Sequence, residues 1–201
     1  MNKSESKYYN TACLMDEAFI LLLDKKEFKY ITAKEVCVKA GVNRSTFYLH
    51  YESMNDLLEE SFQYVLDKFN TKMKEAGNGQ LGKENNSVEK QIKEAGLEEL
   101  YFVTPKYLTP YLQFIGENKR IYAAVMNNIG LFDWKSVYGY IFNRIVSPVC
   151  ERFGEKDEAI KKYVFSFYIK GLAAIVEEWL KRDCKESVEE VISIIKGCMN
   201  R

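Results

Sequence analysis

The stretch ITAKEVCVKAGVNRSTFYLHY, residues 31–51, decides the predicted fold of this chain. Thr32 and Glu35 have the spacing of a capping box, so we expect a helix to begin at residue 33. Gly41 supplies the positive φ that a tight turn between two helices needs. Asn43 is a good N-cap residue for a second helix. The pattern therefore predicts helices at 33–40 and 44–50 that form a helix-turn-helix.

The second of these helices is rich in side chains that can bond phosphates or base edges. Around it, residues 25–51 hold six basic side chains against two acidic ones, whereas residues 52–60 hold four acidic side chains and no basic one. A basic patch bounded by acid fits DNA binding, but it also fits an ordinary solvated surface or a surface helical hairpin. The coincidence of small residues, Gly41 and a donor-rich second helix favours DNA.

The rest of the chain also has the pattern of helices, with three prolines and repeated helix-start signals. The predicted fold class is all-α: a three-helix helix-turn-helix domain at residues 1–52 and a larger helical ligand-binding and dimerisation domain at 53–201, with about nine helices in all. Residues 76–87, rich in Gly and Asn, are expected to form a loop. Outside the helix-turn-helix, helices are expected at 6–26, 54–74, 88–100, 105–116 running on through 119–128, 132–153, 155–182 and 187–199.

Residues 31–57, ITAKEVCVKAGVNRSTFYLHYESMNDL, closely resemble the DNA-binding domain of TetR/AcrR-type regulators. The sequence GLAAIVEEWLKRDCKESVEEVISII, residues 171–195, is similar to the C-terminal end of a subgroup common in Firmicutes. Two departures remove positive charge near the expected DNA surface, because the family commonly has lysine where this chain has Met54 and a basic or neutral residue where it has Glu52.

The resemblance implies a role for each residue of the helix-turn-helix. Thr32 and Tyr48 would bond DNA phosphates, and His50 would lie near the backbone at the end of the recognition helix. A catalytic or metal-binding role for His50 is the alternative, but it lacks partners at ligand spacing. Gly41 and Phe47 would be structural. The predicted DNA-binding residues are Thr32, Asn43, Arg44, Ser45, Thr46, Tyr48 and His50.

A dimer is predicted from residues 163–180, YVFSFYIKGLAAIVEEWL, which are apolar almost all round the expected helix. Such a helix must be covered on most sides, and a second copy of the chain is the natural cover for one of them. The alternative is the central core helix of a monomer. The predicted interface residues are Phe167, Gly171, Ala174, Ile175, Val191 and Ile195.

The region 107–168 is dense in aromatic residues, which suit either a plain core or a pocket for a small, mostly apolar ligand. The resemblance implies that a ligand bound in this domain would release DNA. Pro148 is expected to bend its helix and open space, because proline removes a helical hydrogen bond. The predicted pocket residues are Tyr111, Phe114, Trp134 and Tyr138. The sequence does not identify the small-molecule effector.

Other function classes find little support in the sequence. It contains no P-loop, no dinucleotide-binding glycine motif, no nucleophile elbow and no cluster of His, Cys and carboxylates, so neither enzymatic activity nor a metal or cofactor is expected. Five scattered cysteines fit a reducing cytoplasm, with a redox-sensing cysteine as the alternative. No apolar run or signal sequence predicts contact with a membrane.

The sequence therefore predicts a cytoplasmic, ligand-responsive transcriptional regulator. We expect it to bind a palindromic operator in double-stranded DNA as a homodimer and to be released by a small molecule. Family tendency favours a repressor over an activator. The alternatives are an enzyme and a helical interaction module that does not bind DNA.

Overall fold

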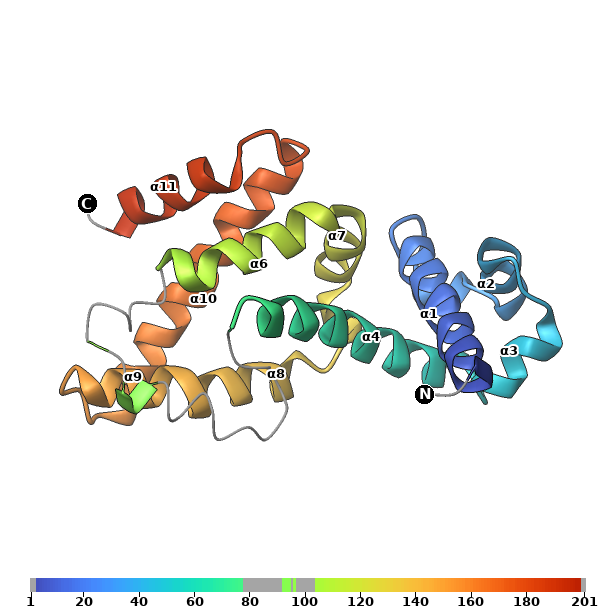
Figure 1. Ribbon diagram of the computed structural model, residues 1–201, viewed down its shortest axis with the longest axis horizontal. Helices are drawn as coiled ribbons and strands as arrows, with labels where there is room; N and C mark the ends of the chain where they lie inside the picture. Colours follow the sequence, from blue (N-terminus) through green and yellow to red (C-terminus); the bar gives the residue numbers. More distant parts are fainter. Residues whose placement is uncertain (1–2, 78–91, 95, 97–103, 200–201) are drawn as a thin grey trace. The chain divides into compact units, whose positions relative to one another are not determined.

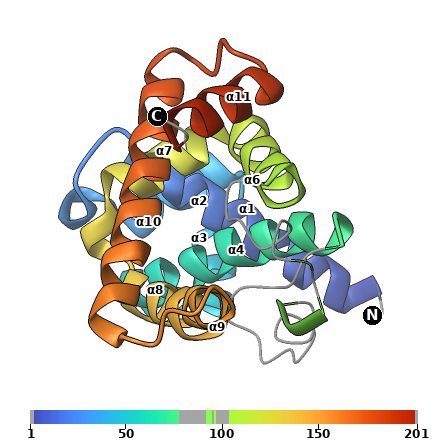
Figure 2. The ribbon, with the colours of Figure 1, turned by 90° about the vertical axis from the view of Figure 1, so that its left-hand side faces the viewer.

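A computed structural model describes residues 3–77, 92–94, 96 and 104–199 of the chain (Figures 1 and 2). Every regular element within these ranges is helical, as predicted. None of the described helices is long and apolar enough to cross a membrane. The predicted loop at 76–87 and the predicted helix at 88–100 lie mostly outside the described residues, which include only a short helical segment at 92–94.

The chain divides into two compact units. The first comprises residues 1–68 and 120–132, and the second comprises residues 69–119 and 133–201. The boundary predicted between residues 52 and 53 lies just before α4 (Met54–Glu75), a helix that contributes residues to both units.

The first unit contains α1 (Lys3–Leu23), the 3-10 turn η1 (Phe28–Tyr30), α2 (Ala33–Ala40), α3 (Arg44–His50) and the first part of α4. It also contains most of α7 (Lys119–Asn127) and the 3-10 turn η3 (Ile129–Leu131). The bounds predicted for α2 and α3 are confirmed. The first unit's fully buried side chains include Met15, Phe19, Ile20, Val36, Phe47 and Leu57.

The helix expected to run from residue 105 through 128 is interrupted, so that prediction was wrong in its continuity. α6 (Pro105–Glu117) ends before Asn118, whose backbone leaves the helical region at φ −123° and ψ 28°. The Asn118 amide side chain donates to the carbonyl of Phe114 at 2.9 Å. This bond satisfies a carbonyl in the last turn of α6, where backbone N–H donors within the helix are lacking. A new helix, α7, begins at Lys119.

The helix predicted at 132–153 is also divided. α8 (Trp134–Ile141) passes into a π-helical turn, η4 (Phe142–Val146), and then into α9 (Ser147–Arg152). Pro148 lacks an amide hydrogen, and its ring would clash with the carbonyl of Arg144 in a regular α-helix. The wider turn directly before Pro148 avoids that clash, so the proline changes the helix where the sequence suggested a bend.

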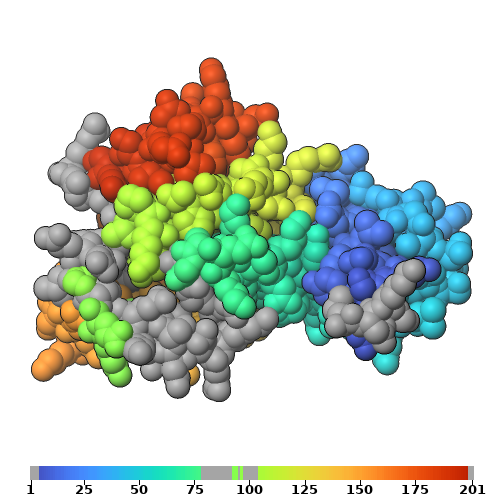
Figure 3. Space-filling model, viewed as in Figure 1, coloured from blue at the N-terminus to red at the C-terminus, as the bar shows by residue number. Residues whose placement is uncertain are grey.

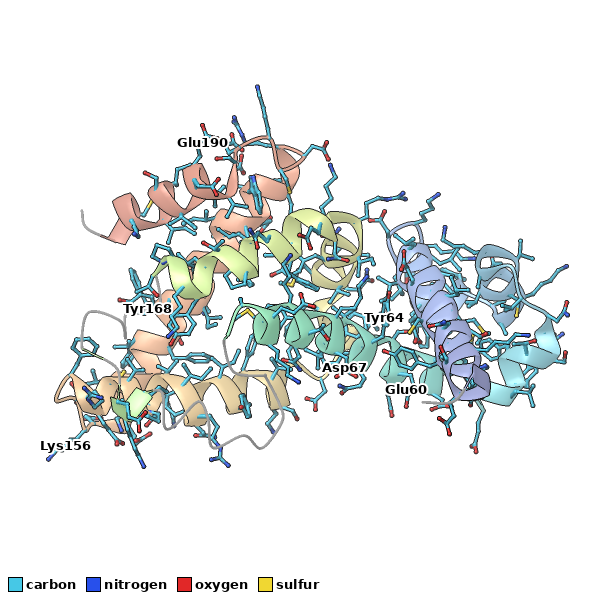
Figure 4. All side chains as sticks on the ribbon, in the orientation of Figure 1. Glu60, Tyr64, Asp67, Lys156, Tyr168 and Glu190 are labelled. Carbon is cyan, nitrogen blue, oxygen red and sulfur yellow. The ribbon has the colours of Figure 1, made fainter. Side chains whose placement is uncertain are left out.

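The second unit is completed by α10 (Glu158–Lys181) and α11 (Val188–Met199). α11 lies beside α6, as the ribbon and the space-filling view both show (Figures 1 and 3). Trp179 of α10 is buried near Gly116 of α6, and its indole nitrogen donates to the carbonyl of Glu186 at 3.0 Å. At the start of α11, near the labelled Glu190 in Figure 4, Ser187 and Glu190 form the predicted capping box.

A buried lysine joins α9 to the first turn of α10. The side chain of Lys161 is 2% exposed, and its ammonium group donates to Ser147 at 3.1 Å and to Glu151 and Glu158 at 2.8 Å each. Three donors thus meet three acceptors, which is the condition for burying an ammonium group without an uncompensated charge.

A buried carboxylate joins three segments of the first unit. Asp16 of α1 is 5% exposed and accepts hydrogen bonds from the Tyr51 hydroxyl at 2.9 Å and the Ser61 hydroxyl at 3.1 Å. Tyr51 follows the last residue of α3, and Ser61 lies in α4, next to the labelled Glu60 in Figure 4. Burial raises the pKa of Asp16 to about 6, although the two hydrogen bonds act to lower it.

This pKa predicts a specific pH dependence of stability. Between the ordinary aspartate pKa of about 4 and a value of about 6, the folded chain binds more protons than the unfolded chain. The free energy of unfolding therefore falls as the pH rises through this window, by at most roughly 3 kcal/mol. Asp16→Asn removes the ionisation while keeping an oxygen acceptor for Tyr51 and Ser61.

We expect denaturant unfolding at about pH 4 and about pH 8 to show that the unmodified chain loses stability relative to Asp16→Asn, by about 1–3 kcal/mol. Asp24→Asn, at an exposed position directly after α1, is the control and should follow the unmodified chain. Equal pH dependence of the unmodified chain and Asp16→Asn would contradict this assignment.

Candidate nucleic-acid interface

The first helix of the helix-turn-helix begins with the predicted capping box. The Glu35 amide donates to the Thr32 hydroxyl at 3.3 Å, and the Thr32 amide donates to the Glu35 carboxylate at 3.0 Å. Lys26, between α1 and η1, forms an ion pair with the same carboxylate. The hydrogen bonds from Lys26 and then Thr32 lower the pKa of Glu35 to about 2. Thr32 is therefore held at the exposed start of α2.

The turn forms as the sequence predicts, with one difference. Gly41 has φ 70° and ψ 30°, and the Val42 amide bonds back to the carbonyl of Cys37 at 3.0 Å. These features are typical of a helix end closed by a left-handed residue, which glycine adopts without strain. Asn43 occupies the N-cap position of α3, but its side chain makes no capping hydrogen bond there. The structure therefore confirms the exposed Asn43 as the N-cap residue of α3, although without a side-chain hydrogen bond to the helix.

Phe47 is the one residue of α3 that is buried, at 1% exposure. Successive residues of an α-helix are about 100° apart, so Ser45 lies on the side opposite Phe47, and Arg44 and Thr46 lie between. Arg44, Ser45 and Tyr48 are exposed, and Thr46 and His50 are half-buried. The predicted donors of α3 therefore share one outward surface.

Arg44 and Tyr48 form a pair on this surface. The guanidinium donates to the Tyr48 hydroxyl at 3.2 Å and lies 5.6 Å from the centre of the ring. The hydrogen bond raises the pKa of Arg44. Both side chains are thereby held along one flank of α3, with donor groups of the guanidinium left over for a ligand.

Tyr8, on α1, contributes to this surface although no sequence motif points to it. Its ring stacks on the His50 ring with centroids 3.9 Å apart, and its hydroxyl donates to the carbonyl of Leu49 at 3.1 Å. Partial burial lowers the pKa of His50. No local pattern could reveal this contact, since about forty residues separate its partners.

Carboxylates mark one edge of the outward surface. Residues 48–53 and the first residues of α4 line a hollow of about 690 Å³ that contains Glu52, Asp56 and Glu59. The Asp56 carboxylate accepts from the Glu52 amide at 2.9 Å, while the Asp56 amide donates to the Ser53 hydroxyl at 3.1 Å. The negative charge of these three residues disfavours a phosphate beside Glu52 and the first turns of α4, so an anionic ligand on α3 would end before these carboxylates.

The residues predicted at a dimer interface fall into two groups in the second unit. Phe167 and Ala174 are exposed on α10, while Gly171 and Ile175 are half-buried. Val191 and Ile195 of α11 are at most 1% exposed within a single chain. They face the protomer core, so they are not available to a second copy. Periodicity identified an apolar face of α11 but not the helix that covers it.

The residues predicted to line a ligand pocket also fall into two groups. Tyr111 and Phe114 of α6 contact Phe69 edge to face, with ring centroids 6.2 Å and 5.3 Å apart. Trp134 stacks on Tyr138 at 5.7 Å within α8, and Tyr138 contacts Phe165 of α10. Phe114 is buried at 4% exposure and belongs to the core, while the other three side chains are half-buried.

Comparisons with known proteins agree with this fold. The TetR-type family model described as the transcriptional regulator C-terminal region matches residues 104–201. No curated protein matches the chain. Solved structures do match, and three of them cover at least 90% of this chain.

The first is a proposed fatty acid metabolism regulator from Clostridium perfringens, with a TM-score of 0.62 at 18% identity over 90% of this chain and 94% of that one. The second is the fatty acid degradation regulator FadR from Bacillus halodurans, with a TM-score of 0.59 at 16% identity over 92% and 91% of the two chains. A proposed transcriptional regulator from Pseudomonas aeruginosa PAO1 follows, with a TM-score of 0.53 at 14% identity over 100% and 91%.

At these identities the solved structures establish the fold, and the family match covers the helices from α6 to α11. The similarity to the solved structures extends over at least 90% of the chain, whereas the family match does not include the helix-turn-helix of the first unit. Residues 104–201 of the chain therefore match the C-terminal region of TetR-type transcriptional regulators, and the chain as a whole has the fold of the solved regulators.

Proposed function

We propose that this protein binds a palindromic DNA operator through α3 and acts as a ligand-released repressor. The observation that carries the proposal is the outward surface of α3, where exposed donors lie on the second helix of a helix-turn-helix. In this arrangement the second helix enters the major groove and its side chains reach base edges. Arg44 is assigned to bases together with Ser45 and Thr46, while Thr32, Tyr48 and His50 are assigned to phosphates, and Asn43 to the edge of the contact.

The proposal includes a homodimer formed through α10. A stripe of α10 spaced three or four residues apart holds Tyr163 at 77% exposure and Phe167 at 62%. Ala174 continues the same side, and a Cβ atom added at Gly171 would meet no neighbouring atom within 4 Å. Large apolar side chains that a protomer leaves in water favour burial against a partner. Ile194 of α11, also exposed, takes the place first assigned to Val191 and Ile195.

A dimer also supplies what a palindrome requires. Two copies of α3 that are related by a twofold axis meet successive major grooves when they lie about 34–36 Å apart. A single α3, with seven residues, contacts only one half-site. The proposed operator is therefore a pair of inverted half-sites about one helical turn apart.

The effector is proposed to bind in the second unit, between the aromatic residues of α6 and α8. Tyr111, Trp134 and Tyr138 combine apolar area with polar tips and are half-buried, which suits an amphipathic ligand. Two of the similar solved structures are named for fatty acid metabolism or degradation, so fatty acids are the first probes to test.

Selection of bound sequences from random duplex DNA tests the proposed function. We expect the unmodified chain to select an inverted repeat. Arg44→Ala should bind the selected duplex more weakly, by about 1–3 kcal/mol in each half-site, and should no longer prefer one base at the position that Arg44 contacts. Arg120→Ala removes the same charge from an exposed position of α7 and should retain that preference. Failure of the unmodified chain to enrich any sequence would contradict DNA binding.

Gly171→Trp tests the dimer. Because a Cβ atom at Gly171 meets no neighbouring atom within 4 Å in a protomer, and Phe167 on the same side of α10 is exposed, the substitution should leave the monomer folded but clash with a second α10. We expect sedimentation to show a dimer for the unmodified chain and a helical monomer for Gly171→Trp. Lys162→Trp, exposed on another side of α10, should remain dimeric. A monomeric unmodified chain at micromolar concentration would overturn the assignment.

A further inference from the structure

Leu49 presents a large apolar side chain to solvent on the outward surface of α3. It is 73% exposed, although it belongs to the last turn of a helix whose Phe47 is buried at 1%. At about 100° per residue, Leu49 and Ser45 lie together on the side opposite Phe47. Leu49 is therefore the apolar member of the surface that carries Arg44 and Tyr48 on one flank and Thr46 and His50 on the other.

The first unit holds this part of α3 in place. The last carbonyls of a helix have no partner within it, so a final turn tends to fray. Here the Leu49 carbonyl accepts from the Tyr8 hydroxyl at 3.1 Å, and Tyr8 also stacks on His50. On the other side, the Tyr51 amide bonds to the Phe47 carbonyl at 2.9 Å. The backbone that carries the Leu49 side chain is consequently held in place by these hydrogen bonds.

The folded chain gains little from leucine at this position, because an apolar side chain stabilises a fold only when it leaves water. A partner with an apolar group could remove the Leu49 side chain from water, and binding would then be stabilised. Among the base edges of the major groove, the C5-methyl group of thymine is the apolar one, and aliphatic or aromatic side chains contact it. The neighbouring donors of α3 suit the polar edges on either side.

We propose that Leu49 is a specificity-determining residue that contacts a thymine methyl group in each operator half-site. The inference rests on the proposed function, since it requires α3 to lie in the major groove. It goes further because it assigns the methyl group of one thymine to Leu49, a residue that a search for hydrogen-bonding side chains would not select. Tyr8 is the positioning residue that holds the Leu49 backbone.

Removal of the methyl group from the DNA tests the assignment directly. In the duplex selected by the unmodified chain, each thymine of the half-site is replaced in turn by deoxyuridine, which keeps all the hydrogen-bonding groups. Burial of one methyl group corresponds to about a fourfold change in affinity, or about fifteenfold when both half-sites are changed. We expect one thymine position to show this decrease in affinity, and Leu49→Ala to bind the thymine and uracil duplexes equally.

Val38→Ala is the matched control, because Val38 of α2 is 74% exposed and is also aliphatic. This variant should discriminate thymine from uracil as the unmodified chain does, and both variants should keep the melting temperature of the unmodified chain. If the unmodified chain selects no duplex, the proposed function fails and this inference fails with it. If it binds but no thymine position is sensitive to the methyl group, or Leu49→Ala keeps the discrimination, the inference fails while the proposed function stands.

Discussion

The burial of Phe47 is the interaction on which the candidate interface depends. α3 has seven residues, far fewer than the roughly 12–15 that an isolated helix needs to be even marginally stable in water. The buried ring of Phe47 therefore anchors α3 to the first unit. This ring packs against the Tyr51 ring, with the two ring centroids 5.4 Å apart. With the inward position fixed, every other residue of the helix has a defined direction, and the donors share one surface.

Two hydroxyl groups reinforce that anchor. Tyr51 donates to the buried Asp16 carboxylate, and Tyr8 donates to the carbonyl of Leu49. Both bonds connect the end of α3 to α1, so the first helix acts as the frame against which α3 is oriented. Asp16 also accepts from Ser61 of α4, which extends the same frame to the helix that enters the second unit. A buried carboxylate costs stability through desolvation, so this network favours a defined geometry over maximal stability.

The sequence predicts the elements whose causes are local. The capping box of Thr32, the left-handed turn at Gly41 and the bounds of α2 and α3 depend on residues within a few positions of one another, and the structure confirms them. Contacts between distant residues were not predictable in this way. Tyr8 and Leu49 are 41 residues apart, and Asp16 and Ser61 are 45 apart. Similarly, α11 has the apolar stripe that the sequence predicts, but Val191 and Ile195 are already buried within a single chain, in which α11 packs against α6.

Amide hydrogen exchange with and without the selected duplex tests the central claim, that α3 is the surface that meets DNA. We expect slower exchange in peptides covering α3 and the start of α2 when the duplex is added, because contacts along α3 oppose the opening of a short helix. The Arg44→Ala variant should show much less of this protection at the same concentration of DNA. Unchanged exchange across residues 32–51 in a sample that binds the duplex would contradict the account.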